Sequence, residues 1–177
     1  MKTSDLCDAS DEIEACTLAW QSFGHRRAFA GTIQTVQCFE TVDLIVASLN
    51  QPGHDRVLVI DGGGSARRAL FGDRLAELAM RNGWRGLVIN GAIRDAQEIN
   101  AMDLGVKALG TAPRRGEKSK DGLINVPVTF GEVTFTPGCR LVADADGVVV
   151  LPLHRHENDI RVEEALAQTA SYLAKAS

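Results

Sequence analysis

The first part of the chain alternates between continuous apolar runs and segments whose apolar residues recur at helical spacing. Residues 57–60 and 86–89 are unbroken apolar runs, which are typical of strands covered on both faces. Residues 28–38 are rich in β-branched side chains and predict another strand, and residues 106–109 predict one more. This part of the sequence therefore predicts βα units.

Apolar residues at helical spacing predict two helices between these strands. The first is capped by Thr41 and ends at Pro52-Gly53, and its apolar face comprises Val42, Ile45, Val46 and Leu49. The second starts near Asp73 and stops at Asn82-Gly83, and its inward residues are Leu75, Leu78 and Ala79. A short helical stretch is also expected after Ser65, and the acidic N-terminus predicts short helices on a solvated face.

The pattern changes after a polar, basic loop at residues 112–122. Short strands are predicted at residues 124–128, 133–135, 141–143 and 148–151, separated by Gly, Pro and Asp turns. Residues 153–177 predict an amphipathic C-terminal helix. Because βα units come first and mostly strands follow, we expect a single α/β domain over residues 1–177, with layered sheets flanked by helices.

Composition narrows the class of protein and its partners. The chain has 177 residues, 45% of them hydrophobic, and a net charge of -4, so we expect one sizeable core and no general attraction to nucleic acid or to anionic membrane. The N-terminus has no apolar signal region, and no apolar run is long enough to span a bilayer. Four cysteines occur without Cys-x-x-Cys spacing, which argues against a zinc or redox motif and favours a cytoplasmic protein.

A triple-glycine turn, Asp61-Gly62-Gly63-Gly64, follows one predicted strand. It does not match the dinucleotide fingerprint, because Arg67 stands where glycine or alanine is required. No Gly-Lys-Ser/Thr follows, so it is not an NTPase phosphate loop either. Two interpretations stay open: a tight turn that needs positive φ, or a concavity whose amides favour anions.

Charged residues lie where the predicted strands end, which is where α/β proteins gather their ligands. One strand leads directly to Arg94-Asp95, and another leads through the glycine turn to Asp73 at a helix start. Arg94 can bind a carboxylate with two parallel hydrogen bonds, and an adjacent helix N-terminus adds positive charge and free N–H groups. Asp95 can hold a divalent cation completed by water and substrate oxygens. This set suits a small α-keto acid.

Helix capping offers a simpler interpretation of the same acids. Asp95-Ala96-Gln97-Glu98 is similar to a capping box, and Asp73 is placed to act as an N-cap. Taken one at a time, each acid fits a cap better than a ligand. Their combination with Arg94 favours a site.

Twenty residues separate Asp73, in the segment Gly72-Asp73-Arg74-Leu75, from Arg94-Asp95. This segment and this spacing resemble the active-site signature of the RraA-like metal-dependent aldolases. The resemblance runs over nearly the whole chain and includes residues 4–8, 128–137 and 143–148. It is strongest at residues 56–69, Arg-Val-Leu-Val-Ile-Asp-Gly-Gly-Gly-Ser-Ala-Arg-Arg-Ala, which is similar to the family's regulators of ribonuclease E.

The resemblance implies a layered β/β/α sandwich of the swivelling-domain type, assembled as a homotrimer or as a hexamer with sites between subunits. It implies metal-dependent cleavage of 4-hydroxy-4-methyl-2-oxoglutarate to pyruvate, with oxaloacetate decarboxylation as a side activity. Gly72, Asp73, Arg74, Leu75 and Arg94 would bind the keto acid. Asp95 would hold Mg²⁺ or Mn²⁺, largely through water. Arg94 and the cation would offset the charge of a pyruvate enolate, and Asp73 would position the water that protonates it.

The chain departs from the family pattern in two places. Pro137-Gly138-Cys139 stands where many aldolases carry Pro-Gly-Asp, which we interpret as a turn change away from the chemistry. The C-terminal acid of larger aldolases has no clear equivalent, and His154, His156 and Glu157 are interpreted as a polar helix start.

The family also contains non-catalytic inhibitors that bind ribonuclease E, but regulators often lose the acid that is kept here as Asp95.

A demethylmenaquinone methyltransferase activity has also been attached to the family. It finds no support in this sequence, because the glycine turn lacks an adenosine-binding context. The basic loop at residues 114–120 is interpreted as solvated, with contact to RNA or to a partner as the alternative.

Overall fold

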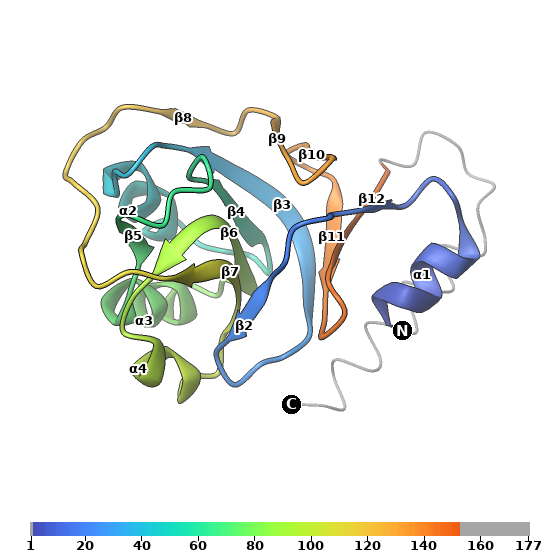
Figure 1. Ribbon diagram of the computed structural model, residues 1–177, viewed down its shortest axis with the longest axis horizontal. Coiled ribbons are helices and arrows are strands. Elements are labelled where there is room, and N and C mark those ends of the chain that lie inside the picture. The colour runs from blue at the N-terminus through green and yellow to red at the C-terminus, as the bar shows by residue number, and fades with distance from the viewer. Residues whose placement is uncertain (1, 153–177) are drawn as a thin grey trace.

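The computed structural model describes residues 2–152 and shows a curled, mixed β-sheet flanked by helices (Figure 1). Ten strands form the main sheet, with the order β1-β12-β11-β3-β4-β6-β7-β2, while β5 pairs with β6 and β8 pairs with β3. The strands β9 (Val128–Phe130) and β10 (Val133–Phe135) form a separate hairpin. This arrangement confirms the layered α/β fold expected from the sequence.

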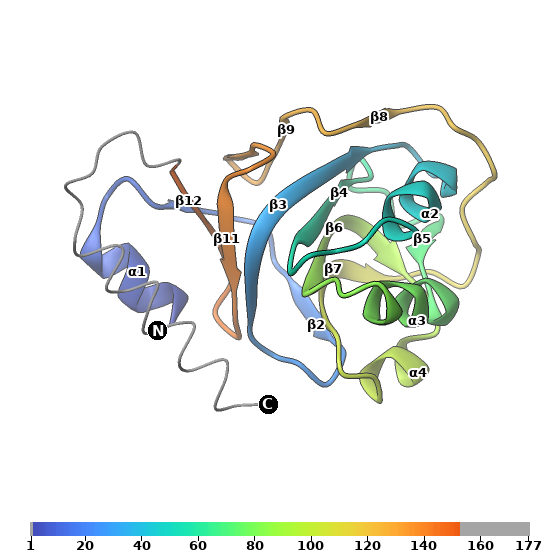
Figure 2. The same cartoon turned by 180° about the vertical axis from the view of Figure 1, so that it is seen from behind.

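Four neighbouring strands make the parallel half of the sheet: β3 (Phe29–Gln37), β4 (Val57–Asp61), β6 (Gly86–Ile93) and β7 (Gly105–Thr111). Three helices lie on one face of this half (Figure 2): α2 (Asp43–Leu49), α3 (Asp73–Arg81) and α4 (Ala96–Asn100). The short strands β2 (Gln21–Phe23), β5 (Ala69–Phe71) and β8 (Leu123–Ile124) are added at its margins.

Alternate residues of the central strands point into two different cores. In β4, Leu58 and Ile60 pack toward the helices, whereas Val57 and Val59 pack toward the β9–β10 hairpin. All four are fully buried. This explains the unbroken apolar run at residues 57–60, because a strand covered on both faces has no position left for a polar side chain.

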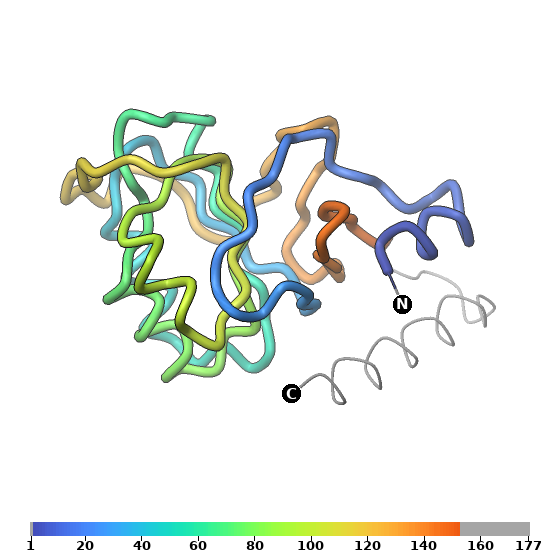
Figure 3. The backbone as a smooth tube through the Cα atoms, turned by 60° about the horizontal axis from the view of Figure 1, so that its bottom comes forward, coloured from blue at the N-terminus to red at the C-terminus, as the bar shows by residue number. Residues whose placement is uncertain are grey.

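The antiparallel half consists of β11 (Arg140–Ala143), β12 (Val148–Leu151) and β1 (Glu14–Ala15), joined to β3 through β11. The helix α1 (Thr3–Ala9) lies beside the β11–β12 hairpin (Figure 3). Leu6 of α1 packs there with Ile13, Val142 and Val149 in a small third core. Thr3 of the same helix donates two hydrogen bonds of 2.7 Å to the carboxylate of Asp144 in the hairpin turn.

Several predicted elements differ from the structure. The stretch after Ser65 is not helical but leads into β5, because Ala69 and Phe71 pair with β6. Residues 124–128 do not form one strand. The break lies at Asn125, which has a φ of 57°, and at Pro127, which lacks an N–H group. The helix α2 begins after Val42, so Thr41 is not its N-cap.

Other predictions held or lie outside the described residues. The strand expected at 28–38 is confirmed as β3, and the helix expected near Asp73 is confirmed as α3. The second strand of the chain, β2, was not predicted. The C-terminal helix expected at 153–177, with His154, His156 and Glu157, lies outside residues 2–152. Within that range the longest helix has 9 residues, and no helix qualifies as a membrane-spanning segment.

Candidate functional site

The predicted site residues come together because β5 and β6 run parallel and end side by side. Phe71 of β5 pairs with Ile93 of β6, so the next residues, Gly72 and Arg94, leave the sheet at the same edge. The N–H of Arg94 donates to the carbonyl of Phe71 at 2.9 Å, which continues the pairing one residue further. The predicted site residues therefore lie together at one edge of the sheet, where the strand-end rule places them.

Asp95 adopts a left-handed backbone conformation with a φ of 55° and a ψ of 41°, which aspartate tolerates better than most residues. Its carboxylate oxygen Oδ2 lies 3.2 Å from Nε of Arg94 and accepts a long hydrogen bond of 3.4 Å from the N–H of Asp73. Although Asp95 stands at the N-cap of α4, its side chain makes no cap hydrogen bond there. The carboxylate is turned toward Arg94 and the start of α3 instead.

Gly72 makes this close approach possible. A Cβ atom at residue 72 would lie 2.6 Å from Oδ2 of Asp95 and 3.2 Å from both Cγ and Nε of Arg94. Real Cβ atoms do not approach an oxygen to 2.6 Å, so any larger residue would displace the carboxylate. The glycine of Gly72-Asp73-Arg74-Leu75 is therefore a geometric requirement of the Arg94–Asp95 pair.

The start of α3 is occupied by carboxylates from within the chain. Gly72 is the N-cap and Asp73 the first helical residue, so Asp73 is not the cap that the sequence allowed. The N–H of Arg74 donates to Oδ1 of Asp73 at 2.7 Å, and the N–H of Asp73 reaches Asp95. The two amides expected to be free for a ligand are thus already engaged, although the positive end of the helix still favours anions nearby.

A cavity of about 450 Å³ opens beside these residues. This volume is in the range of small-molecule sites. The lining residues are Val42, Asp43, Val46, Ala69, Leu70, Phe71, Gly72, Asp73, Arg74, Leu75, Arg94, Arg115 and Lys118. Four of these side chains are cationic and two are anionic. An acidic protein with a net charge of -4 therefore has a locally cationic pocket, which suits an anionic ligand.

All the site residues predicted from the sequence lie at or beside this pocket. Gly72, Asp73, Arg74, Leu75 and Arg94 line it. Asp95 does not line the pocket, but its carboxylate contacts Arg94, which does, and 31% of the Asp95 side chain is exposed.

Two cationic pocket residues were missed: Arg115 and Lys118 belong to the basic loop that was interpreted as solvated. The side chains of Arg115 and Lys118 are exposed, as that interpretation expects, but the backbone of residues 114–117 is hydrogen-bonded to Ala69 and to residues 40–42. The only sign of these two pocket residues in the sequence was the cluster of basic residues around Gly116.

The glycine turn after β4 has no amides to offer an anion. The N–H groups of Gly62 and Gly64 both donate to the carbonyl of Asn90, at 3.0 and 3.1 Å, and the N–H of Gly63 donates to Oδ1 of Asp61 at 3.1 Å. Gly63 and Gly64 have φ values of 64° and 70°. Of the two interpretations left open by the sequence, the structure supports the tight turn.

The donors near the pocket fit one class of cation. In the part of the chain that the structure describes, no group of three or more His, Cys, Asp or Glu side chains could hold a metal ion, which argues against a structural zinc site there. Asp95 and Asp73 together offer at most two carboxylates. Mg²⁺ is commonly bound in this way, through one or two carboxylates with water and substrate oxygens completing the octahedron.

Comparison with known proteins shows consistent similarity over most of the chain. The model of the RraA-like family, described as Aldolase/RraA, matches residues 3–150. A protein of Azotobacter vinelandii named "Putative 4-hydroxy-4-methyl-2-oxoglutarate aldolase" is 51% identical over 151 residues, which cover 85% of this chain and 93% of that protein.

Two solved structures are similar in both fold and sequence. The RNA-processing inhibitor RraA from Thermus thermophilis has a TM-score of 0.85 and 38% identity, covering 90% of this chain and 97% of that one. A Geobacillus kaustophilus protein described as an S-adenosylmethionine: 2-dimethylmenaquinone methyltransferase has a TM-score of 0.83 and 47% identity, covering 88% and 97%.

Proposed function

The chain belongs to the RraA-like family, and we propose that it is a divalent-metal-dependent aldolase that cleaves 4-hydroxy-4-methyl-2-oxoglutarate to pyruvate, with oxaloacetate decarboxylation as a side activity. The observation that carries the proposal is the cationic pocket bounded by Arg94, with the carboxylate of Asp95 beside it in the space that Gly72 leaves open. Relatives named as aldolases at about 50% identity support it. An anionic keto acid is the ligand class that these charges favour.

Arg94 is proposed to bind the keto-acid carboxylate of the substrate. Its Nε is directed to Asp95, and 35% of the side chain is exposed, so the terminal nitrogens remain available to a carboxylate. The carbon–carbon bond between C3 and C4 breaks as the 4-hydroxyl gives its proton to water, and the bonding electrons move toward the C2 keto oxygen. The guanidinium offsets the negative charge that develops there. Asp73 is proposed to hold the water that returns a proton to C3.

Asp95 is proposed to hold Mg²⁺ or Mn²⁺, largely through water. When bound, such a cation supplies Lewis-acid stabilisation of the developing oxyanion. Both contacts of the Asp95 carboxylate use Oδ2. The carboxylate is therefore oriented by Arg94 and by the start of α3, a kind of support that ligating carboxylates usually have.

The proposal is tested by pyruvate release measured through lactate dehydrogenase, with and without a chelator. We expect turnover of 4-hydroxy-4-methyl-2-oxoglutarate and of oxaloacetate that depends on Mg²⁺ or Mn²⁺ and is lost in Asp95→Ala. Asp103→Ala is the matched control, because Asp103 is an exposed acid that pairs with Arg26 and does not line the pocket. Turnover that is absent, or that is unaffected by the chelator, would contradict the proposal.

Inhibition of ribonuclease E by direct binding is the second candidate function. The observation that favours it is the 38% identity and TM-score of 0.85 to the RNA-processing inhibitor RraA. A pull-down and an inhibition assay with ribonuclease E test it. If this role is independent of catalysis, Asp95→Ala should inhibit as well as the unsubstituted chain does.

The assembly of the chain is proposed separately from its catalytic activity. We propose a homotrimer or a hexamer, and the exposed apolar residues Phe39, Leu123 and Ile124 near the junction of β3 and β8 are consistent with self-association. Light scattering measures the stoichiometry.

We do not extend the methyltransferase name to this chain, because the amides of the glycine turn are hydrogen-bonded within the protein.

A further inference from the structure

The backbone of the basic segment at residues 114–117 is fixed against β5, while the side chains of Arg114 and Arg115 are exposed. Ala69 of β5 donates its N–H to the carbonyl of Arg114 at 2.7 Å and accepts from the N–H of Gly116 at 2.8 Å. Ala69 also pairs with Ala92 of β6. A strand residue with two backbone partners has them on opposite sides, so Arg94 and Arg115 approach the pocket from the two flanks of β5.

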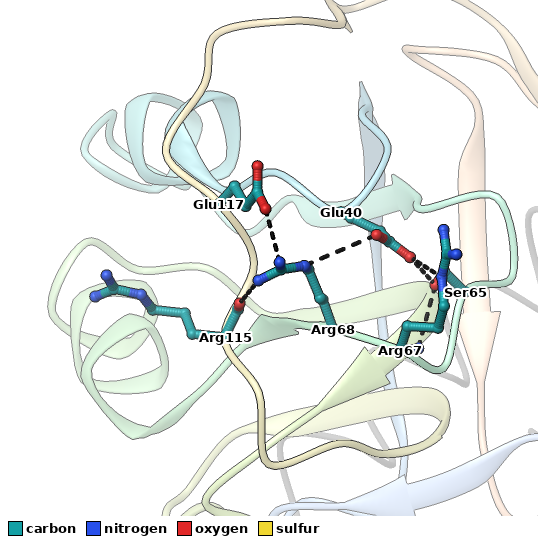
Figure 4. Close-up of polar contacts among 6 residues, drawn as sticks. All are labelled: Glu40, Ser65, Arg67, Arg68, Arg115 and Glu117. Atoms are coloured by element: carbon teal, nitrogen blue, oxygen red, sulfur yellow. Dashed lines mark hydrogen bonds and ion pairs between the residues drawn. The ribbon is translucent and has the colours of Figure 1, made fainter.

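The side chain of Arg68 locks this segment in place (Figure 4). Its NH1 donates to the carbonyl of Arg115 at 3.1 Å, its NH2 lies 2.7 Å from the carboxylate of Glu117, and its Nε lies 3.9 Å from Glu40. All three guanidinium nitrogens therefore have partners within the chain. Arg68 is committed to holding the backbone at residue 115 and has little capacity left for a ligand.

Glu40 anchors this arrangement from the segment before α2. Its carboxylate accepts hydrogen bonds from the hydroxyl of Ser65 at 2.6 Å and from Nε of Arg67 at 2.7 Å. These bonds, with that from Ser65 the largest contribution, lower the pKa of Glu40, so it stays ionised as a partner for arginine. The carbonyl of Glu40 also accepts the N–H of Glu117 at 2.7 Å.

The side chain of Arg115 differs from that of Arg68 because, among the described residues, it has no polar partner. It points away from the Arg68 cluster in Figure 4 and lines the pocket. Within residues 2–152 its guanidinium makes no hydrogen bond or ion pair, whereas Arg94 in the same pocket is paired with Asp95. A fixed backbone that carries an unpaired guanidinium into a cavity is the arrangement expected of an anion-binding residue.

We infer that Arg115 binds the second carboxylate of a dicarboxylic keto acid and that Arg68 is the positioning residue that holds Arg115 at the pocket. This inference rests on the proposed function for the identity of the first carboxylate, which Arg94 binds from the other flank of β5. It names the residue that would distinguish dicarboxylic from monocarboxylic substrates. Hydrogen bonds between charged groups are strong enough for one such contact to decide that preference.

Direct binding of a matched pair of unreactive ligands tests the inference independently of catalysis. 2-Oxoglutarate and 2-oxopentanoate have the same chain length, lack the 4-hydroxyl needed for cleavage and differ in the distal carboxylate. Isothermal titration calorimetry with Mg²⁺ present should show that the unsubstituted protein prefers 2-oxoglutarate. Arg115→Met should weaken 2-oxoglutarate by about 10- to 100-fold and leave 2-oxopentanoate within about twofold.

The adjacent Arg114 supplies the matched control, because it is also exposed and basic but does not line the pocket. Arg114→Met should bind both ligands as the unsubstituted protein does, and Arg115→Lys should recover part of the preference. Arg68→Met should also weaken the preference, since the carbonyl of Arg115 would lose its hydrogen bond and only the bonds of residues 114 and 116 to Ala69 would remain. Thermal unfolding of each variant confirms that it folds.

Three results would overturn the inference. These are no preference for 2-oxoglutarate in the unsubstituted protein, equal effects of Arg114→Met and Arg115→Met, or equal weakening of both ligands by Arg115→Met. If the preference behaves as expected but no pyruvate is released from the aldol substrate, the dicarboxylate site stands and the proposed catalytic function fails.

Discussion

The turns after β4 and β6 leave the parallel sheet at the same edge, but Arg94 after β6 lines the cavity of about 450 Å³, whereas residues 61–64 after β4 do not. At the end of β4, Asp61 accepts hydrogen bonds on Oδ1 from the N–H of Gly63 at 3.1 Å and from Nδ2 of Asn90 at 2.9 Å, and on Oδ2 a longer one from Nε2 of Gln37 at 3.5 Å. After β6, Asp95 makes both of its contacts through Oδ2, one of them at 3.4 Å, beside an arginine that faces a cavity. The first carboxylate closes a turn, and the second remains available beside a cationic pocket.

This difference shows that position at a strand end is not enough to make a site. Both turns carry an aspartate, Asp61 in one and Asp95 in the other, and both follow buried strands. What separates them is whether the polar groups are used within the protein. A carboxylate whose hydrogen bonds are satisfied by the turn stabilises the fold, whereas one with remaining capacity can bind a ligand or a cation.

Substitution of two glycines, Gly72 and Gly62, should have the largest effects. Gly72→Ala should reduce turnover by about 100-fold, because the new Cβ would lie 2.6 Å from Oδ2 of Asp95 and would move that carboxylate. Gly62→Ala should instead act on stability. Its Cβ would lie 2.3 Å from Cδ1 of Leu70 and 2.8 Å from the carbonyl oxygen of Asn90, a clash in the core that costs about 1–3 kcal/mol.

Steady-state kinetics and denaturant unfolding of both variants separate these effects. The account requires a loss of activity with near-normal stability in Gly72→Ala and the reverse in Gly62→Ala. Equal stability losses in the two variants, with equal activity, would show that the two turns do not differ in role.

Asp144 extends the comparison to a third turn, with a smaller expected effect. Burial alone would raise its pKa, but hydrogen bonds from Thr3 and from the N–H groups of Asp146 and Gly147 outweigh burial, so the pKa is lowered. A carboxyl whose pKa is lower in the folded state contributes stability above its unfolded pKa of about 3.9, and that stability is lost as the pH falls toward the folded value.

Melting temperatures as a function of pH test this assignment. Asp144→Asn should melt a few degrees below the unsubstituted protein at neutral pH, and the gap should close as the pH falls below about 4. A gap that stays constant down to strongly acidic pH would show that the charge of Asp144 contributes nothing to the attachment of α1.

The parts of the fold that the sequence predicted are those encoded by local pattern. The buried strands β4 and β6 are unbroken apolar runs, and α3 has helical spacing from its start at Asp73. The strand β5 was missed because it has only 3 residues and is stabilised by pairing with β6, which is not visible in its own sequence.

The candidate site was predicted in part for the same reason. Arg94 and Asp95 directly follow a recognisable strand, so their position could be inferred from the sheet. The place of Arg115 depends on Arg68, Glu40 and Glu117, which come from distant parts of the chain and meet only in the folded structure. A basic loop looks the same in sequence whether it is solvated or fixed.

Pyruvate release by Asp95→Asn and Asp61→Asn, measured side by side at saturating Mg²⁺, shows whether the carboxylate of Asp95 is needed for turnover and that of Asp61 is not. Asparagine tolerates the left-handed conformation found at residue 95, so the change removes the charge without imposing a new backbone. We expect Asp95→Asn to lose about 100-fold or more in turnover of 4-hydroxy-4-methyl-2-oxoglutarate, while Asp61→Asn stays within about threefold of the unsubstituted protein. Full activity in Asp95→Asn, or an equal loss in both variants, would contradict this expectation.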